Sequence, residues 1–238
     1  MSVSRKLTAE GIGTMLLLAG VVGSGIMGER LSNGNAAIAL LANTLATGAT
    51  LIAIILAFGR LSGAHFNPVV TLAVAWEGGL DGAEVLGYLT AQFLGAFGGV
   101  AAAHMMFGEP IFQVSQHIRA GSAQIFSEFI ATFGLLSVIW GCSRVRSEAV
   151  PFAVGSYIMG AYWFTASTSF ANPAVTLARS FTNTFSGIRP IDGPGFIAAQ
   201  LIGAIAAKLL WSWLMPALPK AAEDVVVSHS DRKRIHAR

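Results

Sequence analysis

Six stretches of the chain stay apolar for about 20 residues, the length that an α-helix needs to cross a bilayer. They cover roughly residues 7–28, 37–58, 84–106, 123–142, 149–168 and 195–215. Arg5 and Lys6 precede the first stretch, as basic residues do in a signal peptide. Its apolar part is too long for a signal peptide, however, and no small-residue cleavage site follows. The pattern therefore predicts an all-α membrane protein with six transmembrane helices.

Two further apolar stretches are too short to cross the membrane. One begins at Asn67-Pro68 and ends near residue 76, and the other begins at Asn172-Pro173 and ends near residue 181. Segments of this length between full spans are typical of re-entrant half-helices, which enter the membrane and turn back. Apolar surface loops are the alternative, and the features that the two stretches share argue against it.

The composition agrees with a membrane protein. Of the 238 residues, 54% are hydrophobic and 11% are charged, against roughly 25% charged in an ordinary soluble domain. So few charges cannot cover a water-soluble protein of this size, whereas the 27 glycines suit closely packed transmembrane helices. The net charge of +3 gives little support to nucleic-acid binding. The single cysteine, Cys142, excludes an intramolecular disulfide.

The distribution of lysine and arginine indicates the orientation. With six spans, ten of these residues fall on the side that holds both termini, namely Arg5, Lys6, Arg60, Arg144, Arg146, Lys220, Arg232, Lys233, Arg234 and Arg238. The opposite side holds four: Arg30, Arg119, Arg179 and Arg189. Because positive residues favour the cytoplasmic side, we expect a multi-pass protein of the cell (inner or plasma) membrane with both termini in the cytoplasm.

Three short motifs occur twice along the chain, in the same order. The pairs are Ala9-Glu10-Gly11-Ile12-Gly13-Thr14 with Ser127-Glu128-Phe129-Ile130-Ala131-Thr132, Asn67-Pro68-Val69-Val70-Thr71-Leu72-Ala73 with Asn172-Pro173-Ala174-Val175-Thr176-Leu177-Ala178, and Ala91-Gln92 with Ala199-Gln200. Each repeat, about residues 7–106 and 123–215, contains three spans. Because three is odd, the second repeat enters the membrane upside down, an architecture that places a functional site near the midplane. The two Asn-Pro segments then meet tip to tip.

The facing Asn-Pro segments predict a specific kind of pore. Proline suits the first position of a helix, and the preceding Asn67 or Asn172 is a strong helix N-cap. Each helix N-terminus carries about half a positive charge, so two of them facing one passage repel cations. A capping asparagine can still offer amide N–H groups to a passing oxygen. The sequence therefore favours a pore for neutral polar molecules.

These motifs resemble the aquaporin (major intrinsic protein) family. The resemblance rests on the paired Asn-Pro boxes, on the run Ser62-Gly63-Ala64-His65-Phe66-Asn67-Pro68, and on the glutamate near the start of each repeat. It covers about residues 7–215, within one channel domain of residues 1–220 that is followed by a basic cytoplasmic tail, 221–238. The resemblance implies a homotetramer in the lipid bilayer, with one pore per subunit and passive conduction that needs no cofactor.

The resemblance also implies roles for particular residues. The central constriction would comprise the two boxes, Asn67, Pro68 and Val69 with Asn172, Pro173 and Ala174, where Val69 replaces the usual alanine without disturbing the helix start. Glu10 and Glu128 would anchor the re-entrant loops. A proton-relay pair is the alternative, which the inverted topology disfavours because it places the two carboxylates near opposite faces. His65 would line the pore, or it could be a histidine that is simply hydrogen-bonded.

A second constriction, the selectivity filter, falls by the same resemblance on Thr47, Gly160, Ser169 and Val175. Most members carry an arginine where Val175 stands, and water-selective members tend to carry an aromatic residue and a histidine where Thr47 and Gly160 stand. The aspartate that often follows the second box in glycerol channels is absent too. We therefore expect a filter that is wider, less polar and without a fixed cation.

Arg179 lies one helical turn beyond Val175, on the same face of the half-helix. The favoured interpretation places it in the vestibule, as a solvated helix end or a contact to lipid headgroups. The other interpretation is a partial replacement for the missing filter charge.

Together these features predict a channel for small uncharged solutes: water, glycerol-like polyols, and neutral metalloid hydroxides such as arsenous acid. The arsenic link rests on a resemblance to bacterial members with valine at the filter position, and Cys142 adds nothing to it because a lone thiol in a span is an ordinary packing residue. A water-selective aquaporin is the main alternative. A secondary transporter would need acidic residues near the box tips, and the two helix dipoles oppose an ion channel. The sequence shows no nucleophile–base pair, metal cluster or phosphate loop, so an enzyme is not expected.

Overall fold

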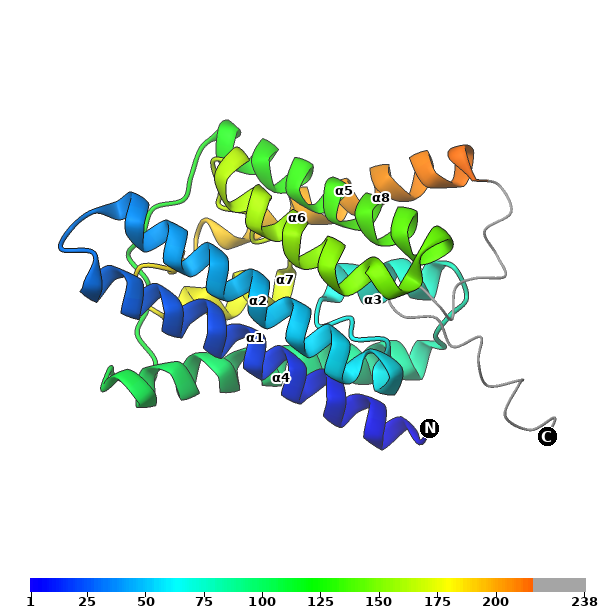
Figure 1. Ribbon diagram of the computed structural model, residues 1–238, viewed down its shortest axis with the longest axis horizontal. Coiled ribbons are helices and arrows are strands. Elements are labelled where there is room, and N and C mark those ends of the chain that lie inside the picture. The colour runs from blue at the N-terminus through cyan, green and yellow to red at the C-terminus, as the bar shows by residue number, and fades with distance from the viewer. Residues whose placement is uncertain (216–238) are drawn as a thin grey trace.

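Long apolar helices make up most of the structure, a computed structural model that describes residues 1–215. The helices are α1 (Val3–Leu31), α2 (Ala36–Ser62), α3 (Pro68–Trp76), α4 (Gly82–Phe107), α5 (Ser122–Val145), α6 (Val150–Phe164), α7 (Pro173–Ala178) and α8 (Gly193–Leu214). The basic tail expected at 221–238 lies outside the described residues. The all-helical architecture that the sequence predicts is confirmed (Figure 1).

Within residues 1–215, five helices are long and apolar enough to cross a membrane: α1, α2, α4, α5 and α8. The sixth predicted span, residues 149–168, is the shorter helix α6 of 15 residues. It ends at Phe164, four residues earlier than predicted, because Thr165 is extended and opens the loop that leads to the second half-helix. An α-helix of this length rises roughly 23 Å, less than the roughly 30 Å of a bilayer core.

The two predicted half-helices are present and start at the prolines. The first, α3, runs for nine residues from Pro68 to Trp76, as predicted. The second, α7, has only six residues and passes into a 3₁₀ turn over Arg179–Phe181. The α-helical part of the second half-helix is therefore shorter than the sequence indicates, and Arg179 is the first residue after it.

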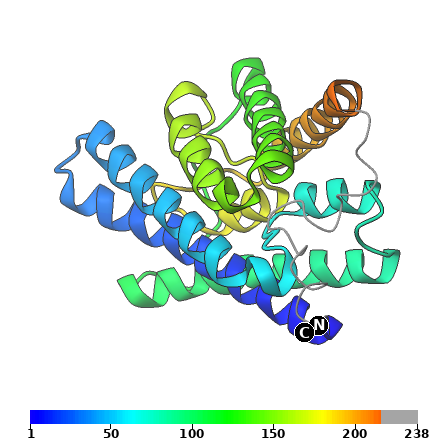
Figure 2. The same ribbon diagram turned by 45° about the vertical axis from the view of Figure 1, so that its right-hand side comes forward.

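The packing follows the internal repeat. In the first half α1 packs against α2 and α4, in the second half α5 packs against α6 and α8, and α2 joins the halves by packing on α6. The half-helices α3 and α7 lie inside the bundle, where each contacts both α4 and α8 (Figures 1 and 2). The two short helices are therefore held by helices from both repeats, and their N-termini meet in the interior.

Equivalent glycines let the main helices of each repeat approach closely. A Cβ atom on Gly95 of α4 would overlap the backbone oxygen of Gly11 in α1. A Cβ atom on its counterpart Gly203 of α8 would lie 2.5 Å from the backbone oxygen of Phe129 in α5. Neither backbone oxygen can move without shifting a helix, so both glycines are required by the crossing.

We expect Gly95→Ala to destabilise the protein by about 1–3 kcal/mol, the usual cost of overfilling a packed core. Gly98→Ala in the same helix is the matched control, because its Cβ would lie 3.7 Å from the flexible side chain of Met15. The control should be neutral or slightly stabilising, since alanine favours helix over glycine. Thermal unfolding in detergent measures the difference, and equal melting temperatures for the two variants would contradict the close crossing.

Candidate functional site

The two Asn-Pro boxes build matching helix starts at the centre of the bundle. Asn67 Oδ1 accepts a hydrogen bond from the Val69 amide at 3.0 Å, and Asn172 Oδ1 accepts from the Ala174 amide at 2.9 Å. Both prolines occupy the first turn of their helix, as their fixed backbone angle favours. Val69 and Ala174 are fully buried and lie outside the wall of the cavity described below. The substitution of valine for the usual alanine therefore does not narrow this cavity.

The two asparagines also connect the halves directly. Asn67 Nδ2 donates to the carbonyl of Ala171 at 2.8 Å, and Asn172 Nδ2 donates to the carbonyl of Phe66 at 2.8 Å. Each amide carries two N–H donors, so one remains for another acceptor. These reciprocal bonds fix the two tips against each other.

The loops that precede the boxes share an unusual backbone. Ala64 and Phe66 have φ values of 51° and 48°, and their counterparts 105 positions later, Ser169 and Ala171, have 52° and 48°. Non-glycine residues seldom adopt positive φ, a strained state that persists only when the surroundings hold it. The structure therefore needs strong local contacts at both loops.

The two buried glutamates supply those contacts. Glu10 accepts hydrogen bonds from the backbone amides of His65 at 3.0 Å and Phe66 at 2.8 Å. Glu128 accepts from the amides of Phe170 and Ala171, both at 2.8 Å. Each carboxylate is thus occupied by the amides of a strained loop.

Two glutamines complete the arrangement, and the sequence analysis assigned them no role. Gln92 Nε2 donates to Glu10 and to Thr71 Oγ1, and Gln200 Nε2 donates to Glu128 and to Thr176 Oγ1. The Ala-Gln pair that recurs in both repeats could have pointed to these glutamines. Their role, which is to donate hydrogen bonds to the two glutamates, is seen only in the tertiary contacts.

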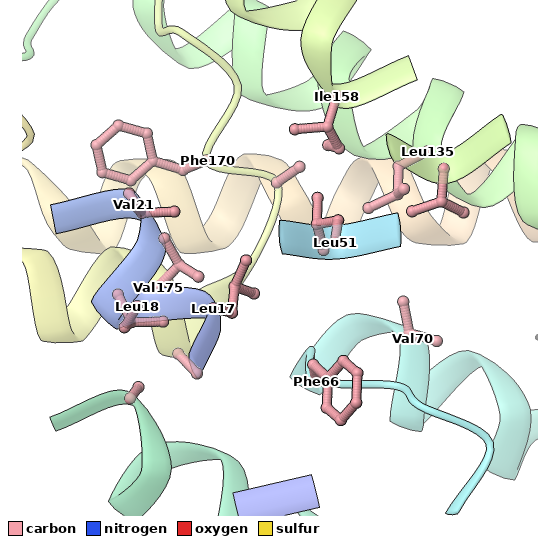
Figure 3. Close-up of a cluster of buried hydrophobic side chains, with 14 of the residues drawn as sticks. Leu17, Leu18, Val21, Leu51, Phe66, Val70, Leu135, Ile158, Phe170 and Val175 are labelled. Atoms are coloured by element: carbon pink, nitrogen blue, oxygen red, sulfur yellow. The ribbon is translucent and has the colours of Figure 1, made fainter. Parts of the chain in front are cut away.

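A cavity of about 60 Å³ lies between the helix tips, several times the roughly 10–15 Å³ that one water needs. It is lined by Asn67, Asn172 and mostly apolar side chains from α1, α2, α5, α6 and both half-helices. Figure 3 shows part of this wall, with Leu17 and Val21 of α1 near Phe170 and Val175. We call the part beside His65 the α3 end of the pore, and the part beside Val175 the α7 end.

His65 occupies the wall at the α3 end. Its Nδ1 lies 3.1 Å from Thr71 Oγ1, and its ring centroid lies 5.2 Å from that of Tyr88. The side chain therefore both lines the cavity and has a hydrogen-bond partner.

Three of the four expected filter residues meet at the α7 end. Thr47, Ser169 and Val175 line the cavity, whereas Gly160 is exposed and is not among the lining residues. The assignment of Gly160 to the filter stays a prediction. The α6 residue in the wall is Tyr162, whose hydroxyl lies 3.3 Å from Thr47 Oγ1. Two positions along a helix correspond to a turn of about 200°, so Gly160 and Tyr162 lie on nearly opposite faces of α6.

Arg179 differs from the favoured expectation of a solvated helix end. Its exposed fraction is 2%, and it lines the cavity at the α7 end. The guanidinium lies over the Phe170 ring with Cζ 3.5 Å from the ring centroid, and Nε donates to the carbonyl of Ser186. Arg179, at the C-cap of α7, therefore lies inside the bundle. The expectation of a filter end without a fixed cation is thus corrected.

Metal chemistry finds no support in the described part of the chain. No group of three or more histidine, cysteine, aspartate or glutamate side chains within residues 1–215 is placed to hold a metal ion. The polar groups of the cavity wall are amides, hydroxyls, one imidazole and one guanidinium. Such a wall can bind and orient a solute through hydrogen bonds.

The sequence matches the family described as Major intrinsic protein over residues 1–161 and 142–235. The chain is 54% identical over 218 residues to Aquaglyceroporin AqpS of Rhizobium meliloti (strain 1021), covering 91% of this chain and 93% of that protein. It is 30% identical to the Glycerol uptake facilitator protein of Streptococcus pneumoniae (strain ATCC BAA-255 / R6), covering 87% and 98%. The fold is similar to the X-ray structure of the aquaglyceroporin from Plasmodium falciparum, with a TM-score of 0.72, 22% identity and coverage of 91% and 99%.

We expect Glu10→Ala to destabilise the protein strongly, because it leaves the His65 and Phe66 amides buried without an acceptor, at about 1–3 kcal/mol for each group. Glu10→Gln should have a smaller effect, since it keeps one carbonyl acceptor. Glu84→Ala is the control, because its ion pair with Lys6 is partly exposed and such pairs contribute about 0–1 kcal/mol. Thermal unfolding in detergent ranks the three variants. If the Glu10→Ala protein were as stable as the Glu84→Ala protein, the re-entrant loop would not need the Glu10 carboxylate to keep its conformation.

Proposed function

The chain belongs to the major intrinsic protein family, and we propose that it is a passive channel for small uncharged solutes, from water to glycerol-sized polyols. The observation that carries this proposal is the cavity between the two asparagine tips, whose wall is mostly apolar with a few hydrogen-bonding groups. The family is one of membrane channels, so the chain is a multi-pass channel protein and not an enzyme.

The selectivity for neutral solutes follows from the two tips. A solute that reaches the centre meets the remaining amide N–H of Asn67 and of Asn172, and its oxygen accepts from them. The N-termini of α3 and α7 point to the same place, and each carries about half a positive charge. A cation must give up its water there without gaining an acceptor, whereas a hydroxyl-bearing solute exchanges one hydrogen-bond partner for another.

The α7 end supports solutes larger than water. Val175 leaves its position in the wall apolar, and the hydroxyls of Thr47, Tyr162 and Ser169 stand around it. Ser169 Oγ is buried and has no hydrogen-bond partner within residues 1–215. A polyol presents both carbon–hydrogen and hydroxyl surfaces, and this combination of an apolar side chain and hydroxyl groups suits it.

We extend the proposal to neutral metalloid hydroxides. Arsenous acid is uncharged at neutral pH, is close to glycerol in size, and carries hydroxyls that can exchange with the same groups. The 54% identity to a protein named as an aquaglyceroporin favours this broad class over a water-selective channel. A secondary transporter is disfavoured because Glu10 and Glu128, the carboxylates nearest the tips, are occupied by backbone amides.

The orientation and assembly are part of the proposal. The excess of lysine and arginine on one side supports cytoplasmic termini, which places the α7 end toward the outside and the α3 end toward the cytoplasm. Family membership supports four copies in the membrane, each with its own pore. Protease accessibility of a terminal tag in oriented vesicles tests the first statement, and the mass of the detergent-solubilised protein tests the second.

We expect proteoliposomes that contain the protein to admit water, glycerol and arsenous acid faster than empty vesicles, with no effect on sucrose. Stopped-flow light scattering after an osmotic step measures each rate. Passage of water alone would support the water-selective alternative. A saturable flux that depends on an ion gradient would support a transporter, and a steady conductance in planar bilayers would support an ion channel.

We expect Val175→Arg to slow glycerol and arsenous acid by about tenfold or more, equivalent to about 1.4 kcal/mol in the barrier, and to slow water less. The larger side chain narrows the α7 end, and a water molecule needs less width. Val175→Met is the matched control, because methionine adds length without charge or branching. Equal slowing of all three solutes by Val175→Arg would show that this position does not select by size.

A further inference from the structure

Two arginines contact the same buried aromatic ring at the α7 end of the pore. Arg179 Cζ lies 3.5 Å from the centroid of Phe170, and Arg119 Cζ lies 5.0 Å from it. Arg179 comes from the end of the second half-helix, whereas Arg119 comes from the loop that joins the two repeats. The internal repeat does not account for this arrangement, because the position of the first repeat that corresponds to Arg179 is not an arginine.

Neither arginine has an acidic partner within residues 1–215. No carboxylate oxygen lies within 4.0 Å of either guanidinium. The guanidinium of Arg119 donates to the carbonyls of Gly187 and Ser167, and Arg179 Nε donates to the carbonyl of Ser186. Within residues 1–215, the hydrogen-bond acceptors of both guanidinium groups are therefore neutral, and both groups contact the ring.

The acidic groups in this region are already occupied. Glu128 accepts from the amides of Phe170 and Ala171 and from Gln200. Asp192 pairs with Arg189 at 3.0 Å and accepts the backbone amide of Arg119 at 2.9 Å. The hydrogen bond from Arg189 holds the pKa of the Asp192 carboxyl below its usual range. The negative charge of Glu128 acts on both guanidinium groups from a distance, but neither carboxylate forms an ion pair with either of them.

Two neighbouring hydroxyls also lack partners. Ser169 Oγ lies in the cavity wall, and Ser186 Oγ belongs to the residue whose carbonyl receives Arg179 Nε. Both oxygen atoms are buried without a hydrogen bond inside residues 1–215. A buried polar group without a partner is costly, so hydroxyls without partners and guanidinium groups without an ion-pair partner lie in the same region.

Arg30, at the same end of the bundle, is an arginine whose charge is balanced by a carboxylate. It also contacts an aromatic ring, with Cζ 5.4 Å from the centroid of Phe107, but its Nη2 lies 2.8 Å from a Glu109 oxygen. It is half-exposed as well. Arg179 is only 2% exposed and lacks the carboxylate partner that Arg30 has, and a cation–π contact offsets only part of the cost of burying a charge.

We propose that the α7 end is a binding site for a small monovalent oxyanion, held by the guanidinium of Arg179 and by the Ser169 hydroxyl. Arg119, behind Phe170, adds positive potential without lining the cavity. A planar or tetrahedral oxyanion matches the fork of N–H donors that a guanidinium presents. Because the site lies in the pore wall, the bound anion occupies the path of the neutral solute and slows its flux.

The first experiment measures glycerol flux, and so rests on the channel function proposed above. Proteoliposomes are loaded and bathed with sodium nitrate or with sodium gluconate, an anion too large for the cavity, at equal ionic strength. We expect nitrate to slow glycerol entry, by about tenfold when its concentration is ten times its Kd, since only the unoccupied fraction conducts. Arg179→Gln should abolish this inhibition. Arg30→Gln, which removes the same charge from the same end, should leave both the flux and its inhibition unchanged.

The second experiment detects binding without flux. Nitrate should raise the melting temperature of the detergent-solubilised wild type and of Arg30→Gln relative to gluconate, because a ligand of the folded state stabilises it, and should not raise that of Arg179→Gln. If Arg179→Gln does not fold, Arg179→Lys replaces it. This variant keeps the charge but loses the fork of donors, and should need several-fold more nitrate for the same shift.

The outcomes separate the two proposals. Absence of glycerol flux with a nitrate-dependent melting shift would overturn the channel proposal and keep the anion site. Glycerol flux that ignores nitrate, together with no melting shift, would overturn the anion site and keep the channel. Equal nitrate effects in the wild type and in the Arg179 variant would also overturn it, because the anion would then bind elsewhere.

Discussion

The structure depends on the reciprocal hydrogen bonds between the two asparagine tips. Asn67 donates to the loop of the second repeat, and Asn172 donates to the loop of the first. Each asparagine also caps its own half-helix. A single side-chain amide therefore fixes where one half-helix begins and holds that end against the loop of the other repeat. Helices α4 and α8 hold both half-helices, because each of them contacts α3 and α7. The pore is the space that the arrangement leaves beside the tips.

Holding these tips in place requires a strained backbone, and the buried carboxylates make that backbone possible. The positive φ angles at Ala64, Phe66, Ser169 and Ala171 direct the loop amides toward Glu10 and Glu128. In a membrane interior no water can satisfy these amides, so an acceptor within the protein is needed. The carboxylates are therefore structural, and their saturation by donors leaves them unsuited to carry protons or coupling ions through the pore.

The positive charge at the α7 end of the pore comes from Arg179. Val175, three residues after Asn172, is apolar, and the guanidinium in the wall belongs to Arg179, four residues later. Phe170 makes this possible, because its ring provides a surface on which a buried cation can lie. The wall at this end therefore combines an apolar side chain with a nearby positive charge.

The sequence by itself determined the membrane character, the inverted repeat, the two half-helices and the asparagine caps, because hydrophobic length, motif recurrence and capping chemistry act over short stretches of chain. It also marked Glu10 and Glu128, since a carboxylate within a span needs a partner. It gave no sign that Tyr162 lines the cavity, because α6 presents one face to the pore and only its packing on α2 decides which. Nor did it indicate that Arg179 is buried, because that depends on the Phe170 ring and the Ser186 carbonyl that contact its guanidinium. Contacts between residues distant in the chain set these positions, and such contacts exist only in the tertiary structure.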